Sequence, residues 1–438
     1  MSRNVKPTTP PMNASVRDKV PPLADGVQTS PEAAKSNQLT GPGRIDRPAI
    51  TGLFFGHMAA DFVQGAVPAL IVFFQPLFGL SYFEAAAIVL AATFSSSLAQ
   101  PLFGLWSDRH EALWLLPVGL VLGGVGLSLA VVAPTYPLLL AAVFLSATGV
   151  GGFHPEGAKY AGYAGAGQLG RSVSVFSLGG NIGLALGPIA ASILVLGFGL
   201  HAAVFLGVPP LIIAFILHRQ RHHFATLRPT PRSAGSAHPP TQTGALVLLL
   251  SVVALRSLAF YGLFTFVPLW EIGLGASAGY ATLLLSLILT AGAFGTIVCG
   301  YFADRIGGQR VLLLALAATG PLIAAYVFLG GVAGAAAVIL AGAMTVGTFT
   351  ITTSLSQQYM PGRVAMASGL SMGFSIGLGG VAAIALGSVA DAFSLRSALL
   401  VVAVGAVMAA LLAVALPAAR SSRGRRQSDV SLLLPDVS

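Results

Sequence analysis

Long apolar runs, separated by short polar breaks, fill the chain from about residue 48 to residue 416. Each run is about 20 residues long, which is the length at which an α-helix crosses the hydrocarbon core of a bilayer. Polar, glycine or proline residues mark the breaks, and a longer polar insert follows the sixth run. The predicted spans are 49–76, 83–106, 113–133, 137–159, 172–197, 200–218, 245–271, 280–302, 311–329, 335–358, 365–390 and 397–416.

These twelve spans predict an all-α integral membrane protein built from two pseudo-symmetric six-helix bundles. The bundles are expected at 48–218 and 245–416, joined by a cytoplasmic linker at 219–244. Residues 1–47 are rich in Pro, Ser, Thr and charge and lack the apolar core of a secretory signal, so we expect a disordered cytoplasmic segment. The basic tail, 417–438, is also expected in the cytoplasm.

Composition narrows the class of protein. Hydrophobic residues make up 55% of the chain and charged residues only 8%, whereas a soluble domain has about 25% charged residues. A soluble enzyme, a nucleic-acid-binding protein and a secreted disulfide-rich domain are therefore excluded. The one cysteine, Cys299, cannot form an intrachain disulfide. The net charge is +9. In a membrane protein the informative question is where along the chain the basic residues lie.

Lysines and arginines favour one side of the predicted bilayer. They fall in the N-terminal segment, around the loops after spans 2, 4, 8 and 10, in the central linker and in the tail. The exceptions are Arg256, inside span 7, and Arg396, in the loop between spans 11 and 12. By the positive-inside rule, both termini are expected in the cytoplasm.

A short motif occurs at corresponding places in the two halves. Gly104-Leu-Trp-Ser-Asp108-Arg109 follows span 2, and Gly300-Tyr-Phe-Ala-Asp304-Arg305 follows span 8 and continues to Arg310. Internal duplication about a long linker is typical of alternating-access transporters, in which two repeats move around a site near the bilayer midplane. The sequence therefore predicts a transporter.

The spans, the cytoplasmic termini and the doubled Gly-x3-Asp-Arg motif resemble the major facilitator superfamily over 48–416. Three stretches resemble its fosmidomycin-resistance family of drug exporters: Gly56-His57-Met-Ala-Ala-Asp61, Gln100-Pro101-Leu-Phe-Gly104-x3-Asp108, and Gly151-Gly-Phe-His154-Pro155-Glu156. One departure is that His110-Glu111-Ala112 stands where the superfamily usually has a glycine and basic residues. The resemblance implies export of small phosphonate drugs of the fosmidomycin type.

Asp61 lies near the middle of span 1, where a carboxylate is costly and needs a partner or a role. His57 is one helical turn earlier on the same face. We expect a proton-coupling or substrate-contacting pair, with a structural hydrogen-bonded pair as the alternative.

Arg256 lies at similar depth in span 7 and cannot act as a proton carrier, but it can bind an anion. Its partner is either Asp61 or an anionic substrate, and a purely structural ion pair is a further alternative.

In span 4, His154 and Glu156 are further candidates for proton coupling, with Pro155 bending the helix between them. Lys159 is interpreted as a side chain that extends to the membrane surface.

Asp108 is expected to pair with Arg363 near span 11 and hold one conformation closed. The full set of expected gate residues is Asp108, Arg109, Asp304, Arg305, Arg310 and Arg363.

Span 5 carries small residues at helical spacing. Gly183, Gly187 and Pro188 are expected to bring this helix close to a neighbour. A similar Gly-x3-Gly-Pro element occurs in exporters of the superfamily, so the resemblance also favours efflux.

The sequence has no nucleotide-binding motif and no Cys/His cluster, so we expect no cofactor, no resident metal and transport driven by an ion gradient. The leading hypothesis is a proton-coupled drug exporter of the bacterial inner membrane, monomeric, with a small anionic substrate. The main alternative is an importer or exporter of a natural organic anion. A third hypothesis is a membrane enzyme or receptor, but the doubled Gly-x3-Asp-Arg motif argues against it.

Overall fold

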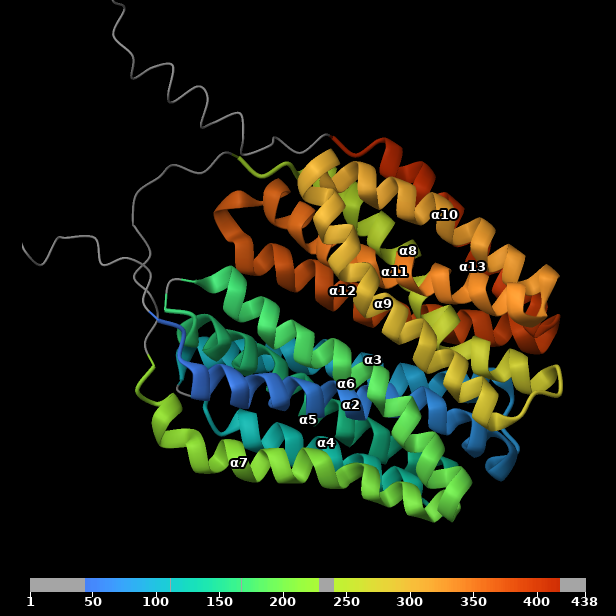
Figure 1. Ribbon diagram of the computed structural model, residues 1–438, viewed down its shortest axis with the longest axis horizontal. Coiled ribbons are helices and arrows are strands. Elements are labelled where there is room, and N and C mark those ends of the chain that lie inside the picture. Colours follow the sequence, from blue (N-terminus) through green and yellow to red (C-terminus); the bar gives the residue numbers. More distant parts are fainter. Residues whose placement is uncertain (1–43, 111, 167, 228–239, 418–438) are drawn as a thin grey trace, which may run out of the picture. The chain divides into compact units, whose positions relative to one another are not determined.

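The computed structural model describes residues 44–110, 112–166, 168–227 and 240–417, and the secondary structure of these residues is helical throughout. Every predicted span has a corresponding helix (Figure 1). The first half contains α2 (Arg47–Phe78), α3 (Tyr82–Arg109), α4 (Leu115–Val131), α5 (Tyr136–Ala164), α6 (Leu169–Phe198), the 3-10 helix η1 (Leu200–Gly207) and α7 (Val208–Phe224). The second half contains α8 (Thr243–Gly273), α9 (Ala278–Ile306), α10 (Gly308–Leu329), α11 (Gly331–Tyr359), the short 3-10 turn η2 (Pro361–Arg363), α12 (Val364–Ala392) and α13 (Leu395–Val414).

Within the described residues, eleven helices are long and apolar enough to cross a membrane. The twelfth span is α4, a shorter apolar helix of 17 residues. The sixth span is built from η1 and α7 together, and α7 continues to Phe224, beyond the expected end at residue 218. The predicted fold class of twelve spans is therefore confirmed.

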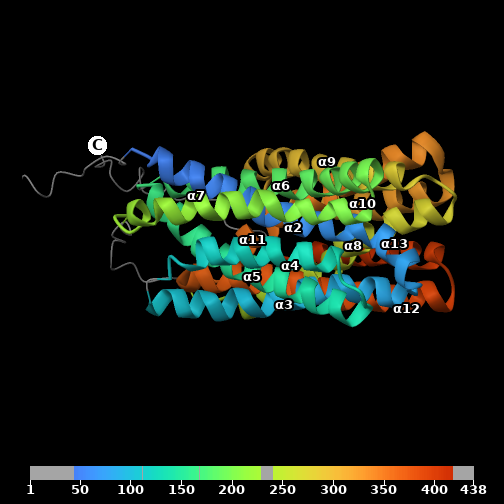
Figure 2. The same ribbon diagram turned by 90° about the horizontal axis from the view of Figure 1, so that it is seen from below.

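The helices form two bundles. In the first, α2 packs mainly on α6, and α5 packs on α3 and α4; in the second, α11 packs on α9 and α10, and α13 packs on α10 and α8. Two helix pairs join the bundles: α3 lies beside α12, and α6 beside α9, in both views (Figures 1 and 2). The two-bundle arrangement puts α2 and α5 at the centre of the first bundle, where the candidate side chains lie.

Glycines bring α2 and α6 into direct backbone contact. A β-carbon added at Gly183 would lie 2.0 Å from the carbonyl oxygen of Met58, and one added at Gly187 would lie 2.5 Å from that of Phe62. Pro188 is buried in α6 just after this contact. Only glycine permits such an approach between helices. The close packing brings the carbonyls and side chains of α6 within reach of the polar residues on α2.

The bundles are joined on the face where α3 begins, which we call the distal face; the opposite face, where α2 begins and α13 ends, is the terminal face. The Asp391 carboxylate, at the end of α12, accepts hydrogen bonds from the backbone amides of Tyr82 and Phe83, each at 2.8 Å. Ser81 caps the next amide of α3, that of Glu84. Asp391 thus completes the N-terminal cap of a helix in the other bundle, where the helix dipole favours an anion.

Two further hydrogen bonds join the bundles, one on the distal side and one near the middle of the helices. On the distal side, Thr282 of α9 donates to the hydroxyl of Ser192 on α6 at 2.8 Å. Near mid-helix, the Ser97 hydroxyl of α3 donates to the carbonyl of Gly373 on α12 at 3.0 Å. The described hydrogen bonds that cross between bundles therefore extend from the distal face only to the middle of the helices.

Removing the distal cap should weaken the structure. Asp391→Ala leaves two amides of α3 without their side-chain acceptor, and we expect a loss of about 1 kcal/mol in the free energy of unfolding, the usual cost of losing an N-cap acceptor. Thermal unfolding of the purified protein measures it. Ser388→Ala is the matched control, because Ser388 bonds only within α12. Equal losses in the two variants would contradict a role for the distal cap.

At the terminal face, Asp46 caps α2. Its Oδ1 accepts from the Ala49 amide at 3.0 Å and lies 2.9 Å from Nε2 of His223, at the end of α7. Partial burial raises the pKa of Asp46, but the hydrogen bonds from His223 and Ala49, together with the His223 charge, lower that pKa below its ordinary value overall. The ionised carboxylate is therefore favoured by the fold.

This lowered pKa predicts a pH dependence. The contribution of ionised Asp46 to stability is complete above the ordinary aspartate pKa, about 3.9, and is lost as the pH falls through the lower pKa of the folded state. Asp46→Asn keeps an N-cap acceptor but cannot ionise. The parent protein should be the more stable at pH 7, and the difference in melting temperature should shrink as the pH falls below the ordinary aspartate pKa and through the lower pKa of the folded state. A difference that did not change with pH would argue against this interaction.

Candidate functional site

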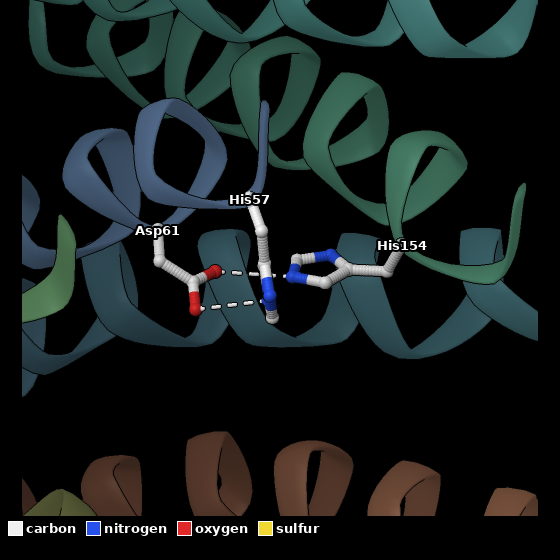
Figure 3. A group of neighbouring side chains, drawn as sticks. All are labelled: His57, Asp61 and His154. Carbon is white, nitrogen blue, oxygen red and sulfur yellow. Dashed lines mark hydrogen bonds and ion pairs between the residues drawn. The ribbon is translucent and has the colours of Figure 1, made fainter. Parts of the chain in front are cut away.

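Three titratable side chains meet inside the first bundle (Figure 3). His57 and Asp61 lie one turn apart on α2, and His154 reaches them from α5. The Nε2 atom of His154 is 3.0 Å from Oδ1 of Asp61, and Nε2 of His57 is 3.3 Å from Oδ2. The side chains are only 12–18% exposed. Each carboxylate oxygen therefore faces one imidazole nitrogen in a largely buried cluster.

The other nitrogen of each imidazole faces a backbone carbonyl. Nδ1 of His57 lies 2.8 Å from the carbonyl oxygen of Phe176 on α6, and Nδ1 of His154 lies 2.9 Å from that of Val150 on α5. A carbonyl oxygen only accepts hydrogen bonds, so both Nδ1 atoms carry a hydrogen. In a neutral imidazole this arrangement leaves Nε2 as a bare acceptor, and both Nε2 atoms face the Asp61 carboxylate.

The cluster is thus satisfied only when protons are added. With both imidazoles neutral and Asp61 ionised, acceptors face acceptors at 3.0 and 3.3 Å. One added proton makes one of these contacts a hydrogen bond, and two added protons make both, whether they sit on nitrogen or on the carboxyl oxygen. The net charge of the three side chains then rises from −1 to 0 and to +1. The Nε2–carboxylate edge therefore has room for two protons, bound one after the other.

Among the described residues, this cluster is also the one group of three such side chains whose donor atoms lie within 4.8 Å of one another, close enough to surround a metal ion. Hydrogen bonds alone account for both of its contacts once protons are present. The expectation of no resident metal stays a prediction.

Aromatic and small residues shape the cluster. The ring of Phe176 stacks on His57 at 4.0 Å between centroids, and the His57 and His154 rings meet edge to face at 5.0 Å. A β-carbon added at Gly180 of α6 would lie 2.5 Å from Oδ2 of Asp61 and 2.6 Å from Nε2 of His57. Gly180 therefore leaves the space that the cluster occupies. Its position in a glycine-rich span was visible in the sequence, but its place beside Asp61 was not.

Glu156 belongs to a separate group. It is completely buried, and its Oε2 lies 2.8 Å from Nζ of Lys159 and accepts a hydrogen bond from the hydroxyl of Ser107, at the end of α3. Its Oε1 has no partner within the described residues. Lys159, interpreted from sequence as reaching for the membrane surface, instead pairs with Glu156 and also donates to the Ser107 carbonyl at 3.1 Å. The structure thus separates Glu156 from its sequence neighbour His154.

Arg256 lies in the second bundle and is 1% exposed. Its guanidinium donates to the Ser375 hydroxyl at 2.5 Å and to the Thr345 carbonyl at 3.4 Å, and it lies 4.7 Å from the ring centre of Phe349. Its Nε donates to nothing in the described part of the chain. No described carboxylate lies within ion-pair distance; Asp61 pairs with the histidines instead. The alternative in which Asp61 is the resting partner of Arg256 is therefore wrong for this structure.

The expected gate residues lie at helix ends on the terminal face. Asp304, Arg305, Arg310 and Arg363 are exposed, and Arg305 covers the ring of Tyr301 at 4.1 Å. The side chains of Asp108 and Arg109 lie outside the described residues, so the expected pair between Asp108 and Arg363 stays a prediction. The distal cap formed by Asp391 was missed, because an acidic residue in a short loop gives no sequence signal for a contact so distant along the chain.

Comparison with known proteins identifies the family. Residues 53–383 match the Major Facilitator Superfamily. The chain belongs to that superfamily. It is 30% identical over 385 residues to the fosmidomycin resistance protein of Escherichia coli (strain K12), covering 85% of this chain and 94% of that protein. It is 27% identical to an uncharacterised transporter of the superfamily from Bacillus subtilis (strain 168), over 84% and 93% of the two chains. The resemblance drawn from the sequence motifs is confirmed.

Solved structures agree on the facilitator fold. A bacterial homologue of the human lysosomal transporter Spinster, in an inward-facing and occupied conformation, superposes with a TM-score of 0.70 at 16% identity, covering 85% of this chain and 97% of that one. A peptide transporter superposes equally well, at 13% identity over 84% and 93%. Family and fold are those of membrane transporters, with no catalytic family indicated.

The crowding at Gly180 predicts a selective packing defect. Gly180→Ala places a methyl group against Asp61 and His57, and we expect it to cost about 1–3 kcal/mol of stability, as overpacking of a filled core does. Gly197→Ala, in the same helix, is the matched control because a β-carbon there meets nothing within 4 Å. Thermal unfolding of both variants measures the difference. A Gly180→Ala variant as stable as the control would show that the space beside Asp61 is not filled.

Proposed function

We propose that this facilitator is a proton-coupled secondary active transporter of the bacterial inner membrane that exports small phosphonate drugs of the fosmidomycin type by alternating access. The observation that carries the proposal is the His57–Asp61–His154 cluster, in which both Nδ1 atoms are committed to carbonyls and the Nε2 edge requires protons. Ionisable groups inside a membrane bundle are characteristic of proton pathways.

Proton binding at this edge acts on helix packing. A fully protonated cluster joins α2 to α5 through Asp61 and His154, and α2 to α6 through His57 and the Phe176 carbonyl. Loss of a proton leaves two acceptors facing each other, which favours separation of α2 from α5. The cluster thereby converts proton occupancy into a preference for one arrangement of the first bundle.

Arg256 supports an anionic substrate. A buried guanidinium without a carboxylate partner is costly, and an anion bound at its free Nε would neutralise it. A phosphonate or carboxylate suits the planar fork of arginine. Because Asp61 and Arg256 are not paired, a proton on Asp61 does not directly release Arg256 for the anion. If Asp61 and the anion competed for Arg256, a proton on Asp61 would help the anion to bind, which is the logic of symport. No such competition exists in this arrangement, which is consistent with proton–substrate exchange.

The distal contacts support alternating access. In the present arrangement the Asp391 carboxylate and the pair Ser192–Thr282 hold the bundles together on one face. Opening that face requires these bonds to break while contacts form on the other face, where the doubled Gly-x3-Asp-Arg motif lies. With both termini cytoplasmic, as the positive-inside rule predicts, the distal face is periplasmic and the present arrangement is held closed on the periplasmic side.

The driving force is adequate for export. One proton entering across 100 mV releases about 2.3 kcal/mol, and a tenfold gradient of substrate corresponds to about 1.4 kcal/mol. A one-to-one exchange therefore supports a gradient of more than tenfold. We expect the transporting unit to be the monomer.

A second candidate function is transport of a natural small organic anion, inward or outward, with drug resistance as a side effect. Arg256 favours it equally, because a guanidinium attracts any small anion and does not distinguish a drug from a metabolite. Expression in a sensitive host, with resistance measured against a panel that includes fosmidomycin, separates the two. Unchanged resistance with the protein present in the membrane would favour the organic anion.

The coupling role of Asp61 is tested in everted membrane vesicles. Asp61→Asn keeps a hydrogen-bonding side chain but cannot be ionised, so we expect fosmidomycin binding to persist and substrate-induced proton release to fall at least tenfold. His57→Gln and His154→Gln should also impair release. His201→Gln, an exposed histidine of η1, is the control and should release protons like the parent. Undiminished proton-coupled transport in Asp61→Asn would make the cluster structural and direct attention to Glu156.

A further inference from the structure

A groove of about 320 Å³ lies between the start of α2 and the end of α7, and its lining includes none of the three side chains of the His57–Asp61–His154 cluster. Its lining is contributed by these two helices alone. The lining residues are Arg47, Pro48, Thr51, Gly52, Phe55, Ile213, Ile216 and Gln220. The groove therefore sits at the terminal ends of two membrane-spanning helices, where hydrocarbon gives way to lipid headgroups and water.

The end of the groove nearest the helix termini is positively charged. Arg47 lines it and is exposed, Arg219 and Arg221 are exposed on either side of the lining residue Gln220 in the chain, and the exposed Arg44 lies three residues before Arg47. The neighbouring carboxylate, Asp46, is already engaged by His223 and by the cap of α2. The local balance favours an anion, and clusters of basic residues beside membrane helices attract acidic lipids.

The deeper end is apolar. Phe55 and Ile216 are each 40% exposed, as expected for apolar side chains that face acyl chains from membrane-spanning helices. Phe215 and Ile212 extend this exposed surface along α7 at 66% and 54%. A hydrated anion gains nothing from such a surface, whereas an acyl chain is matched to it. The groove thus combines a cationic mouth with a hydrocarbon-compatible wall.

One polar group in the groove is unsatisfied by the protein. Oε1 of Gln220 accepts no hydrogen bond from any described residue, and it packs against Gly52, whose missing side chain leaves it room. Buried amide oxygens are almost always paired. Because this oxygen is buried against Gly52, a molecule in the groove can donate to it only after the amide rotates. Phosphate alone provides no strong donor at neutral pH, but a glycerol headgroup provides hydroxyls.

We propose that the α2–α7 groove is a binding site for an anionic phospholipid, with the phosphate at Arg47, a headgroup hydroxyl at Gln220 and an acyl chain along Phe55, Ile213 and Ile216. Phosphatidylglycerol has the required chemistry. The site is independent of the transported substrate and of the proton cluster. Bound lipid would tie the start of the first span to the end of the sixth, on the face that joins the central linker.

A tryptophan reporter tests the site in vesicles. Phe55→Trp places a fluorophore on the groove wall, and the signal of the native tryptophans is subtracted using the parent protein. Bilayers containing brominated phosphatidylglycerol should quench this reporter more strongly than bilayers containing brominated phosphatidylcholine. Adding Arg47→Gln should reduce the preference for the anionic lipid about fivefold, the effect of one basic residue near a membrane surface. Arg396→Gln, which removes the same charge at the distal end, should leave it unchanged.

Three outcomes would overturn the proposal: equal quenching by the two lipids, a preference unaffected by Arg47→Gln, or displacement of the lipid by soluble glycerophosphoglycerol at equal concentration. The last would identify a site for free phosphate anions. If Phe55→Trp does not fold, Ile216→Trp reports from the opposite wall of the same groove. Retained proton-coupled transport in Arg47→Gln, together with lost lipid preference, would separate this site from the transport function.

Discussion

A charge inside the membrane must be neutralised by its immediate neighbours, and this constraint governs both bundles. Water cannot solvate the carboxylate of Asp61 as it would at a protein surface, so two imidazoles surround it. Those imidazoles are themselves oriented by backbone carbonyls on two different helices. The result is a site whose geometry is set by three helices and whose charge is set by the number of protons it holds. The charge of the Arg256 guanidinium is compensated less completely, because a hydroxyl and a carbonyl oxygen contact it in place of a carboxylate.

The close approach of α2 and α6 makes this arrangement possible. Gly183 and Gly187 remove the side chains that would hold the helices apart, and Gly180 removes the one that would occupy the cluster itself. The carbonyl of Phe176 then comes within 2.8 Å of His57. What looks like a packing motif in the sequence therefore also fixes which nitrogen of a histidine carries its hydrogen, and through it where a proton can bind.

Helical spacing made the His57–Asp61 pair and the close packing at Gly183 and Gly187 predictable from the sequence, whereas the partners of most polar side chains were not. The pairing of His57 with Asp61 follows from helical periodicity, and the spans follow from the length of apolar runs. The choice of His154 as the third member, and the separation of Glu156 from it, depend on the rotation of α5 about its axis, which periodicity in so apolar a helix does not specify. The equal depth of Asp61 and Arg256 suggested an ion pair, but depth does not determine on which side of a helix a residue faces. The distal cap at Asp391 depends on the packing of two bundles and has no local signal.

The location of that cap at an aqueous surface has an energetic consequence. Asp391 is exposed, so when the bond to α3 breaks, water replaces it on both the carboxylate and the freed amides. A contact of the same strength buried in hydrocarbon would leave an unsolvated anion behind and would trap the protein in one state. In the proposed alternating-access cycle, solvent exchange at the rim keeps the two states close in free energy. One proton or one bound anion would then be enough to choose between them.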